Sequence, residues 1–205
     1  YSGAPWLTRE SREREEGTRL LLEHLGVEAG MTVCDVGCGN GFYSLQLADM
    51  VGDEGRVLAV DIQPEMLDLL RSRAEAAGLD NIEPVLGTTT DPKLEPGPVD
   101  LALLVDVYHE FDHPEQMLAG LRESLAPGGR LVLAEFRAED PDVPIKPDHK
   151  MSREQAVLEM LAHGFVLADE LDGLPWQHLL PFEGQDTWTT GPTGGPSRGQ
   201  TLERQ

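Results

Sequence analysis

Three glycines at every second position mark the stretch of this sequence where chemistry is most plainly expected. Gly37, Gly39 and Gly41 follow a short apolar run, residues 31–36, that contains the acidic residue Asp35. Glycine accepts positive φ and lets a ligand touch the backbone. A helix that begins after such a turn exposes backbone N–H groups that attract a negatively charged group. The stretch therefore predicts a strand, a tight turn and a helix built around a ligand.

A second carboxylate narrows the choice of ligand. Asp61 ends the next apolar run, residues 56–60, where its side chain can accept both hydroxyls of a ribose. The dinucleotide fingerprint is G-x-G-x-x-G with an acidic residue about 20 positions later, but here the third glycine comes one residue early. The pattern Asp-x-Gly-x-Gly-x-Gly, followed by this second acid, resembles motif I and the next acidic residue of the class I S-adenosylmethionine (SAM)-dependent methyltransferases. The resemblance covers roughly residues 20–182.

This resemblance implies an enzyme that uses SAM as its cofactor and methylates a small molecule. The residues that it assigns to the cofactor are Asp35, Gly37, Cys38, Gly39, Gly41, Asp61, Ile62, Thr88 and Asp106. Asp91 is a further candidate for the adenine edge, in a segment too rich in proline and glycine for the helix usual at this place in the family. The alternative of another class is a SAM- or nucleoside-binding protein without catalysis, because a fold and a cofactor site do not guarantee chemistry.

Histidine chemistry is expected just after the fourth strand. An acceptor that must lose a proton benefits from a general base with a pKa near neutral, and His109 stands where the family handles acceptors. A structural hydrogen bond is an equal alternative for His109, and Tyr108 is a candidate for lining the path of the methyl group. The Asn/Asp-Pro-Pro-aromatic stretch of the family's amino-methyltransferases is missing here, which argues against nucleobase or glutamine acceptors.

The same stretch satisfies H-E-x-x-H, the zinc-protease signature, with His109, Glu110 and His113. That signature needs both histidines on one face of a helix and the glutamate as base. Here it follows a buried strand, and Pro114 biases the residue before it away from helical geometry. A metal site of Asp106 and the two histidines is a second alternative. We expect no metal requirement.

These residues depend for their positions on an α/β fold with alternating strands and helices. The predicted strands are residues 31–36, 56–61, 81–86, 99–105 and 130–136, with a closing pair at 165–170 and 176–182. The pattern predicts a Rossmann-like, open, mostly parallel seven-stranded sheet with helices on both faces and the last strand antiparallel. Ligands of such sheets bind beyond the carboxyl ends of the strands, where the strand order reverses.

The chain divides into three parts in this interpretation. Residues 1–30 form an N-terminal lid or helix segment, 31–182 the SAM-binding domain, and 183–205 a tail expected to be disordered. One charged helix is predicted from Thr8 to Leu25, with Tyr1 and Trp6 as lid residues or simple anchors of the terminus. A long connection, 137–150, and the closing strands offer further candidates for the acceptor pocket, namely His149, Lys150, Trp176 and His178.

Composition excludes some partners. The net charge of −21 argues against nucleic acid, because phosphate binding needs clustered Lys and Arg. No apolar run approaches the roughly 18–20 residues of a membrane span. Cys34 and Cys38 resemble small packing residues in a reducing compartment, so we expect a cytoplasmic protein. Since the first residue is Tyr and not Met, an upstream targeting segment stays open, and so does the oligomeric state.

Overall fold

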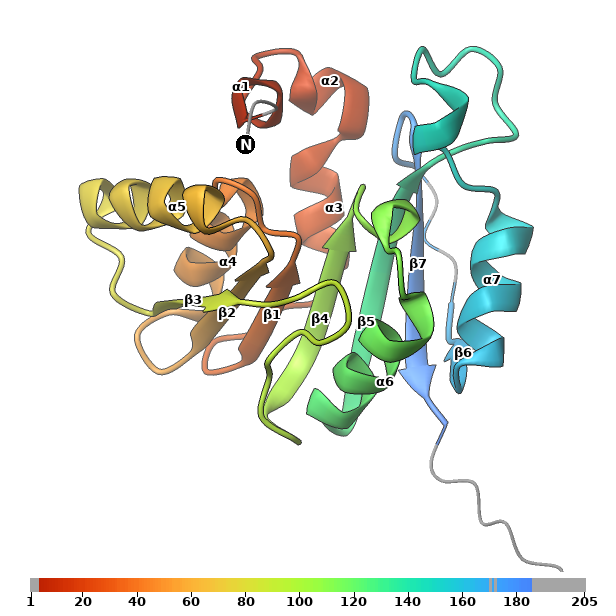
Figure 1. Ribbon diagram of the computed structural model, residues 1–205. Helices are drawn as coiled ribbons and strands as arrows, with labels where there is room; N and C mark the ends of the chain where they lie inside the picture. Colours follow the sequence, from red (N-terminus) through yellow and green to blue (C-terminus); the bar gives the residue numbers. More distant parts are fainter. Residues whose placement is uncertain (1–3, 170, 172, 186–205) are drawn as a thin grey trace, which may run out of the picture.

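A seven-stranded sheet organises the protein in the computed structural model, which describes residues 4–169, 171 and 173–185 (Figure 1). The strand order is β3-β2-β1-β4-β5-β7-β6. Neighbours from β3 to β5 run parallel, whereas β7 runs antiparallel to both β5 and β6. This architecture confirms the predicted sheet. The strands are β1 (Thr32–Val36), β2 (Arg56–Asp61), β3 (Ile82–Leu86), β4 (Val99–Val105), β5 (Leu125–Phe136), β6 (Phe165–Leu167) and β7 (Gln177–Gly184).

Helices cover both faces of the sheet, because its central strands are apolar on both sides. Val33 packs with one set of helices and its neighbour Cys34 with the other, as the alternation of a strand requires. The first set is α3 (Thr18–His24), α4 (Phe42–Val51) and α5 (Pro64–Ala77). The second set is α6 (Pro114–Ser124) and α7 (Arg153–Ala162). Two core layers therefore hold β1 and β4 rigidly in the middle.

The strand order reverses between β1 and β4. The chain passes from β1 outward to β2 and β3, and then returns to the other side of β1 with β4. The carboxyl ends of these parallel strands point toward α1 (Ala4–Leu7) and α2 (Arg12–Glu16), at the top of Figure 1. A ligand crevice is expected at this end of an open sheet.

The N-terminal segment differs from the predicted helix. Instead of one helix from Thr8 to Leu25, the chain forms the two short helices α2 and α3, and the short helix α1 precedes them. Gly17 adopts a left-handed conformation with φ 65° and ends α2, so the direction of the chain changes before α3 begins. A glycine inside a helical pattern makes such a break inexpensive.

The C-terminal elements agree in type with the prediction and differ at their ends. The Ser152 side chain accepts the backbone N–H of Gln155 at 3.1 Å and so caps the N-terminus of α7. Strand β7 continues to Gly184, two residues beyond the predicted domain end at 182, and β6 is shorter than the predicted 165–170. Residues 186–205 of the predicted tail, like Tyr1, lie outside the described residues.

No helix among the described residues is long and apolar enough to cross a membrane.

Candidate functional site

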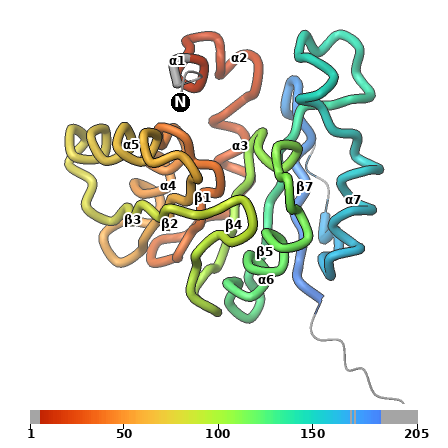
Figure 2. Tube along the Cα trace, viewed as in Figure 1, coloured from red at the N-terminus to blue at the C-terminus, as the bar shows by residue number. Residues whose placement is uncertain are grey.

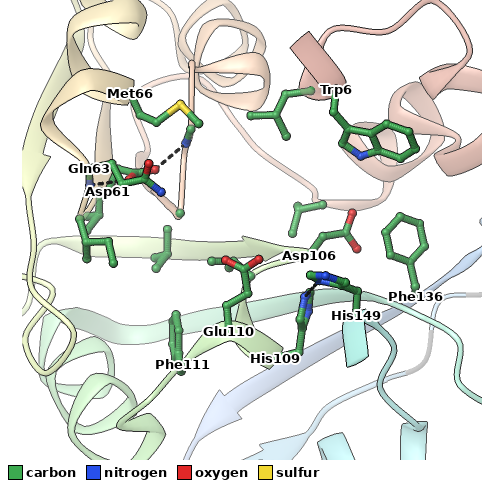
Figure 3. A pocket seen from close by; sticks show the side chains of 18 of the residues that line it. Trp6, Asp61, Gln63, Met66, Asp106, His109, Glu110, Phe111, Phe136 and His149 are labelled. Carbon is green, nitrogen blue, oxygen red and sulfur yellow. Dashed lines mark hydrogen bonds between the residues drawn. The ribbon is translucent and has the colours of Figure 1, made fainter. Parts of the chain in front are cut away.

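A cavity of about 670 Å³ lies at the carboxyl ends of β1, β2 and β4. One side is formed by the glycine turn and the end of β2, and the other by the segment after β4 (Figure 3). The N-terminal segment and the connection 137–150 also contribute to its wall, and both lie at the same end of the sheet (Figure 2). Seven of the predicted site residues line it: Gly37, Gly39, Asp61, Ile62, Thr88, Asp106 and His109.

The glycine turn is shaped by close approaches that exclude a side chain. Gly37 has φ 70°, and a Cβ atom on it would lie 2.3 Å from Val107. Gly39 has φ 53°, and its Cβ would lie 2.6 Å from Leu7 of α1. The N–H groups of Gly37 and Cys38 donate to the carbonyl of Val60. The backbone N–H groups of Gly37 and Cys38 thus fix the turn to β2.

Asp61 is held in place by the backbone on both of its oxygens. Oδ2 accepts the N–H of Gly39 at 2.9 Å, and Oδ1 accepts the N–H of Gln63 at 2.8 Å. A carboxylate offers about four lone-pair directions, so this buried side chain retains acceptor capacity toward the cavity. Ile62 and Thr88 line the same end. Asp91 does not line the cavity and pairs with Lys93 instead.

Four predicted site residues lie outside the cavity wall: Asp35, Cys38, Gly41 and Tyr108. Asp35 is buried beneath the turn and accepts the Ser44 hydroxyl at 2.6 Å, and burial raises its pKa to about 6. Tyr108 is buried in the core, where its hydroxyl donates to Glu159 of α7 at 2.9 Å. The two cysteines are buried free thiols whose pKa values burial raises. They pack as predicted.

A charged cluster from the N-terminal segment closes one end of the cavity. Arg12 and Glu16 of α2 both line it, and they form a buried ion pair of 2.7 Å. The Arg12 guanidinium also stacks on Phe42, 4.1 Å from its ring centroid. Trp6, a candidate lid residue, lines the cavity as well and carries Arg9 on its ring at 3.7 Å. The N-terminal segment is therefore part of the site.

Asp106 lies opposite this cluster in a strained conformation. Its φ of 51° is unusual for a residue other than glycine. Both of its carboxylate oxygens accept from Nε2 of Gln177 at 2.8 Å. Burial, together with the neighbouring Glu135 and Glu16, raises the pKa of Asp106 well above its usual value. Strain and an unusual protonation equilibrium in a cavity wall are typical of functional positions.

Two buried polar atoms near this end have no hydrogen-bond partner among the described residues. They are the hydroxyl of Tyr43 and Oε1 of Gln177. Orphaned buried polar atoms cost free energy and call for a ligand or a water molecule. Because Gln177 already contacts Asp106, its carbonyl oxygen supplies an acceptor close to the cavity wall.

His109 is anchored by a buried glutamate. Its Nδ1 lies 2.6 Å from Oε2 of Glu135, while Oε1 of the same carboxylate accepts the Tyr108 N–H at 2.8 Å. The hydrogen bond to a carboxylate places the proton on Nδ1 and leaves Nε2 with the lone pair. Burial lowers the pKa of His109, but the hydrogen bond and the charge of Glu135 outweigh burial and raise it overall.

Nε2 of His109 faces a second histidine from a distant segment. It lies 3.1 Å from Nδ1 of His149, which belongs to the short helix η2 (Pro147–His149) in the connection 137–150. Glu110 points to the same side (Figure 3), and one donor atom each of His109, Glu110 and His149 lie within 4.8 Å of one another. Of the acceptor candidates on this connection and the closing strands, His149 lines the cavity, whereas Lys150, Trp176 and His178 do not.

The zinc-protease geometry is not formed. His109 belongs to the short 3₁₀ helix η1 (Tyr108–Glu110), whereas His113 is the residue before α6 with φ −132°. The two histidines therefore do not share a helix face, and His113 does not line the cavity. The signature arises from two separate local structures.

Sequence reasoning missed the residues that support the site from a distance. Glu135 lies in the apolar strand β5, where a single acidic residue at a buried position was the available signal. Arg12 and Glu16 fall inside the predicted helix from Thr8 to Leu25 and had no predicted role, whereas both are buried in α2, which ends at Gly17.

Comparison with known proteins identifies the family of this chain. A family model described as a methyltransferase domain matches residues 27–186. The chain belongs to this methyltransferase domain family. It is 29% identical over 131 residues to protein-L-isoaspartate O-methyltransferase of Methanococcoides burtonii, covering 64% of this chain and 62% of that protein. It is 25% identical over 167 residues to demethylmenaquinone methyltransferase of Shouchella clausii, covering 80% and 69%.

The methyltransferase domain is also found in solved structures. A SAM-dependent methyltransferase from Aquifex aeolicus superposes with a TM-score of 0.82 at 26% identity, over 88% of this chain and 96% of that one. The family predicted from the glycine spacing is thus confirmed. The chain spans only part of its curated relatives, from 33% of a 37.1 kDa transposon protein of Streptomyces fradiae to 69% of the demethylmenaquinone methyltransferase.

Proposed function

We propose that this methyltransferase domain transfers a methyl group from SAM to a small-molecule acceptor. The observation that carries this proposal is one cavity with two chemically different ends. A carboxylate suited to ribose hydroxyls, Asp61, lies at one end, and a histidine held by a buried glutamate, His109, lies at the other. The family and the SAM-dependent relative from Aquifex aeolicus support the choice of cofactor.

The adenosine of SAM fits the end formed by β2. Asp61 keeps lone pairs for the ribose hydroxyls, and Ile62, half exposed in the cavity wall, offers an apolar surface for the adenine ring. Thr88 is the candidate for the adenine edge. Asp35 and Gly41 contribute from behind by fixing the turn, and they do not contact the cofactor in this proposal.

The methionine part of SAM then extends past Gly37 toward the charged cluster. Its α-carboxylate and α-ammonium need one partner of each sign, and the Arg12–Glu16 pair supplies both. Asp106 and the orphaned carbonyl of Gln177 add acceptors for the ammonium group. In this proposal the N-terminal segment closes over the cofactor as a lid.

His109 is the proposed catalytic residue at the acceptor end. Methyl transfer from a sulfonium is an in-line displacement, so most of the acceleration comes from holding donor and acceptor in contact. An acceptor hydroxyl or amine must also lose its proton. Nε2 of His109 carries the lone pair that acts on it, either by taking the proton or by holding a metal ion that lowers the acceptor pKa. Tyr108 is turned into the core and has no part in this step.

A small acceptor suits the cavity better than a protein segment. The wall opposite the glycine turn is formed by Phe111, Phe136 and Ile145, and the connection 137–150 covers it. A cavity of about 670 Å³ lies within the roughly 300–1,000 Å³ typical of small-ligand sites. The relatives include a protein-L-isoaspartate O-methyltransferase and a demethylmenaquinone methyltransferase by name, so the labelling experiment follows both protein and small-molecule fractions.

Calorimetry and a labelled methyl donor test the proposal together. SAM and S-adenosylhomocysteine should bind with one site per chain, whereas NAD should not; tighter binding of NAD would exclude the cofactor assignment. Incubation with methyl-labelled SAM and a metabolite extract should then yield a labelled small molecule. Binding of SAM without any labelled product, across protein and small-molecule fractions, would favour the non-catalytic alternative.

A further inference from the structure

The donor atoms around His109 have the composition of an open metal site. His109, His149 and Glu110 offer two imidazole nitrogens and one carboxylate oxygen, all within 4.8 Å of one another. Ligands bound tetrahedrally to zinc at about 2.0–2.2 Å lie roughly 3.3–3.5 Å apart. The two nitrogens, at 3.1 Å, already have nearly this spacing. Glu110 is exposed, so a change of its side-chain rotamer completes the set.

A buried carboxylate orients one of these ligands from behind. Glu135 is 1% exposed and accepts from Nδ1 of His109 at 2.6 Å, so that Nε2 of this ring is fixed toward His149. Metal-bound histidines nearly always donate their other ring N–H to a carboxylate, a carbonyl or water. The arrangement shares His109 and Glu110 with the H-E-x-x-H signature but differs from it in the third ligand, because His149, 40 residues from His109, takes the place of His113.

The three donor residues all belong to the wall of the cavity. His109, Glu110 and His149 all line it, so a ligand on their open side is reached by a molecule bound there. Some catalytic zinc sites have this donor set of two histidines and one glutamate, and their fourth coordination position is open to water or substrate. The buried cysteines are too deep to compete for the ion.

We propose that His109, His149 and Glu110 bind one divalent metal ion of the zinc class, with the fourth position open to the methyl acceptor. This revises the expectation from sequence that no metal takes part.

The use of the ion rests on the proposed function. An acceptor hydroxyl that occupies the open position has its pKa lowered by the metal and releases its proton to water. The oxygen then attacks the methyl carbon of SAM. The carbon–sulfur bond breaks with its electron pair going to sulfur, which converts the sulfonium into the uncharged thioether of S-adenosylhomocysteine. This places oxygen acceptors, such as phenols or other hydroxyl compounds, ahead of nitrogen acceptors.

The site can be tested without knowing the acceptor. The untagged full chain is freed of metal with a chelator and then titrated with Zn²⁺ in a calorimeter. The titration is made at pH 8 because the histidines must be deprotonated to bind. Wild type should bind one equivalent. Glu135→Gln should weaken binding by about 10–100-fold, as loss of an outer partner does. His149→Gln and Glu110→Gln should weaken it by at least as much.

The matched control is His113→Gln, which removes the other histidine of the H-E-x-x-H stretch and should leave zinc affinity unchanged. Affinity for S-adenosylhomocysteine, measured on every variant, shows that each has folded. No saturable zinc binding by wild type, or equal loss in His113→Gln and His149→Gln, would overturn the proposed site. Failure of the SAM proposal appears separately, as absence of S-adenosylhomocysteine binding in wild type that still binds zinc.

Discussion

Glu135 holds His109 from inside the sheet: one carboxylate oxygen lies 2.6 Å from Nδ1 of the imidazole, and the other accepts the N–H of Tyr108 at 2.8 Å. A side chain of β5 thereby fixes the ring at the end of β4, across a pair of parallel strands. The position of the imidazole is therefore set by a buried residue of an interior strand. For this reason a substitution of His109 should affect chemistry without disturbing the distant cofactor end.

We expect His109→Asn to separate methyl transfer from cofactor binding. S-adenosylhomocysteine affinity should stay within about twofold, since Asp61 and the glycine turn are unchanged, whereas transfer should fall by roughly 10²–10⁴-fold, the usual contribution of a positioned proton-handling group. Once the acceptor is identified, single-turnover rates and calorimetry check both values. Wild-type turnover in this variant would remove His109 from the mechanism.

Asp61→Ala should weaken S-adenosylhomocysteine binding by about 1.5–3 kcal/mol, the range for hydrogen bonds to a charged group. The loss of affinity has two parts. The ribose hydroxyls lose their acceptor, and so do the N–H groups of Gly39 and Gln63, which fix the turn beside the ribose. Asp91→Ala is the matched control, since that carboxylate is outside the cavity wall. Isothermal titration of both variants decides the point: equal dissociation constants for wild type and Asp61→Ala would exclude the ribose contact.

Asp35 should give stability a pH dependence. Burial raises its pKa from the usual 3.8 to about 6 in the folded chain, so the folded state binds the proton more tightly than the unfolded state. Stability from this group is complete below about pH 3.8 and is lost as pH rises through 6, a change of about 3 kcal/mol. Asp35→Asn lacks this loss. Urea unfolding should therefore show that the free energy of unfolding of the variant, relative to that of wild type, rises between pH 4.5 and pH 7.5. The same difference in free energy at both pH values would contradict this prediction.

Gly37→Ala should destabilise the fold more than Gly30→Ala. Both glycines have positive φ, which costs an alanine roughly 1–2 kcal/mol. The Cβ at position 37 would also lie 2.3 Å from Val107, whereas nothing lies within 4 Å at position 30. The clash should add about 1–3 kcal/mol. Denaturant midpoints measure both, and Val107→Ala in the Gly37→Ala background should recover part of the difference. Equal losses at the two positions would mean that the turn moves aside freely.

The parts of the site that follow each other along the chain were predictable, and those joined only in space were not. The glycine spacing and Asp61 indicated both the fold and one end of the cavity, because strand, turn and helix have local signals. Glu135 comes near His109 from 26 residues away, and no periodicity relates the two residues. His149 was a predicted candidate for the acceptor pocket and does line the cavity, but its contact with His109, 40 residues away, was not predicted. The helix break at Gly17 was not predicted either, because many helices tolerate a glycine. This break ends α2, the helix that carries Arg12 and Glu16.

The seclusion of Cys34 and Cys38 has a practical consequence for studying this protein. They are the two cysteines of the chain; the first is fully buried, the second is 6% exposed, and burial raises the pKa of both thiols. Thiol reagents react with accessible thiolates, so we expect almost no labelling of the native cysteines. A single cysteine introduced in the N-terminal segment would accept a fluorophore on an otherwise silent background. The fluorescence of this label, with and without S-adenosylhomocysteine, would then test the proposed closure of that segment over the cofactor.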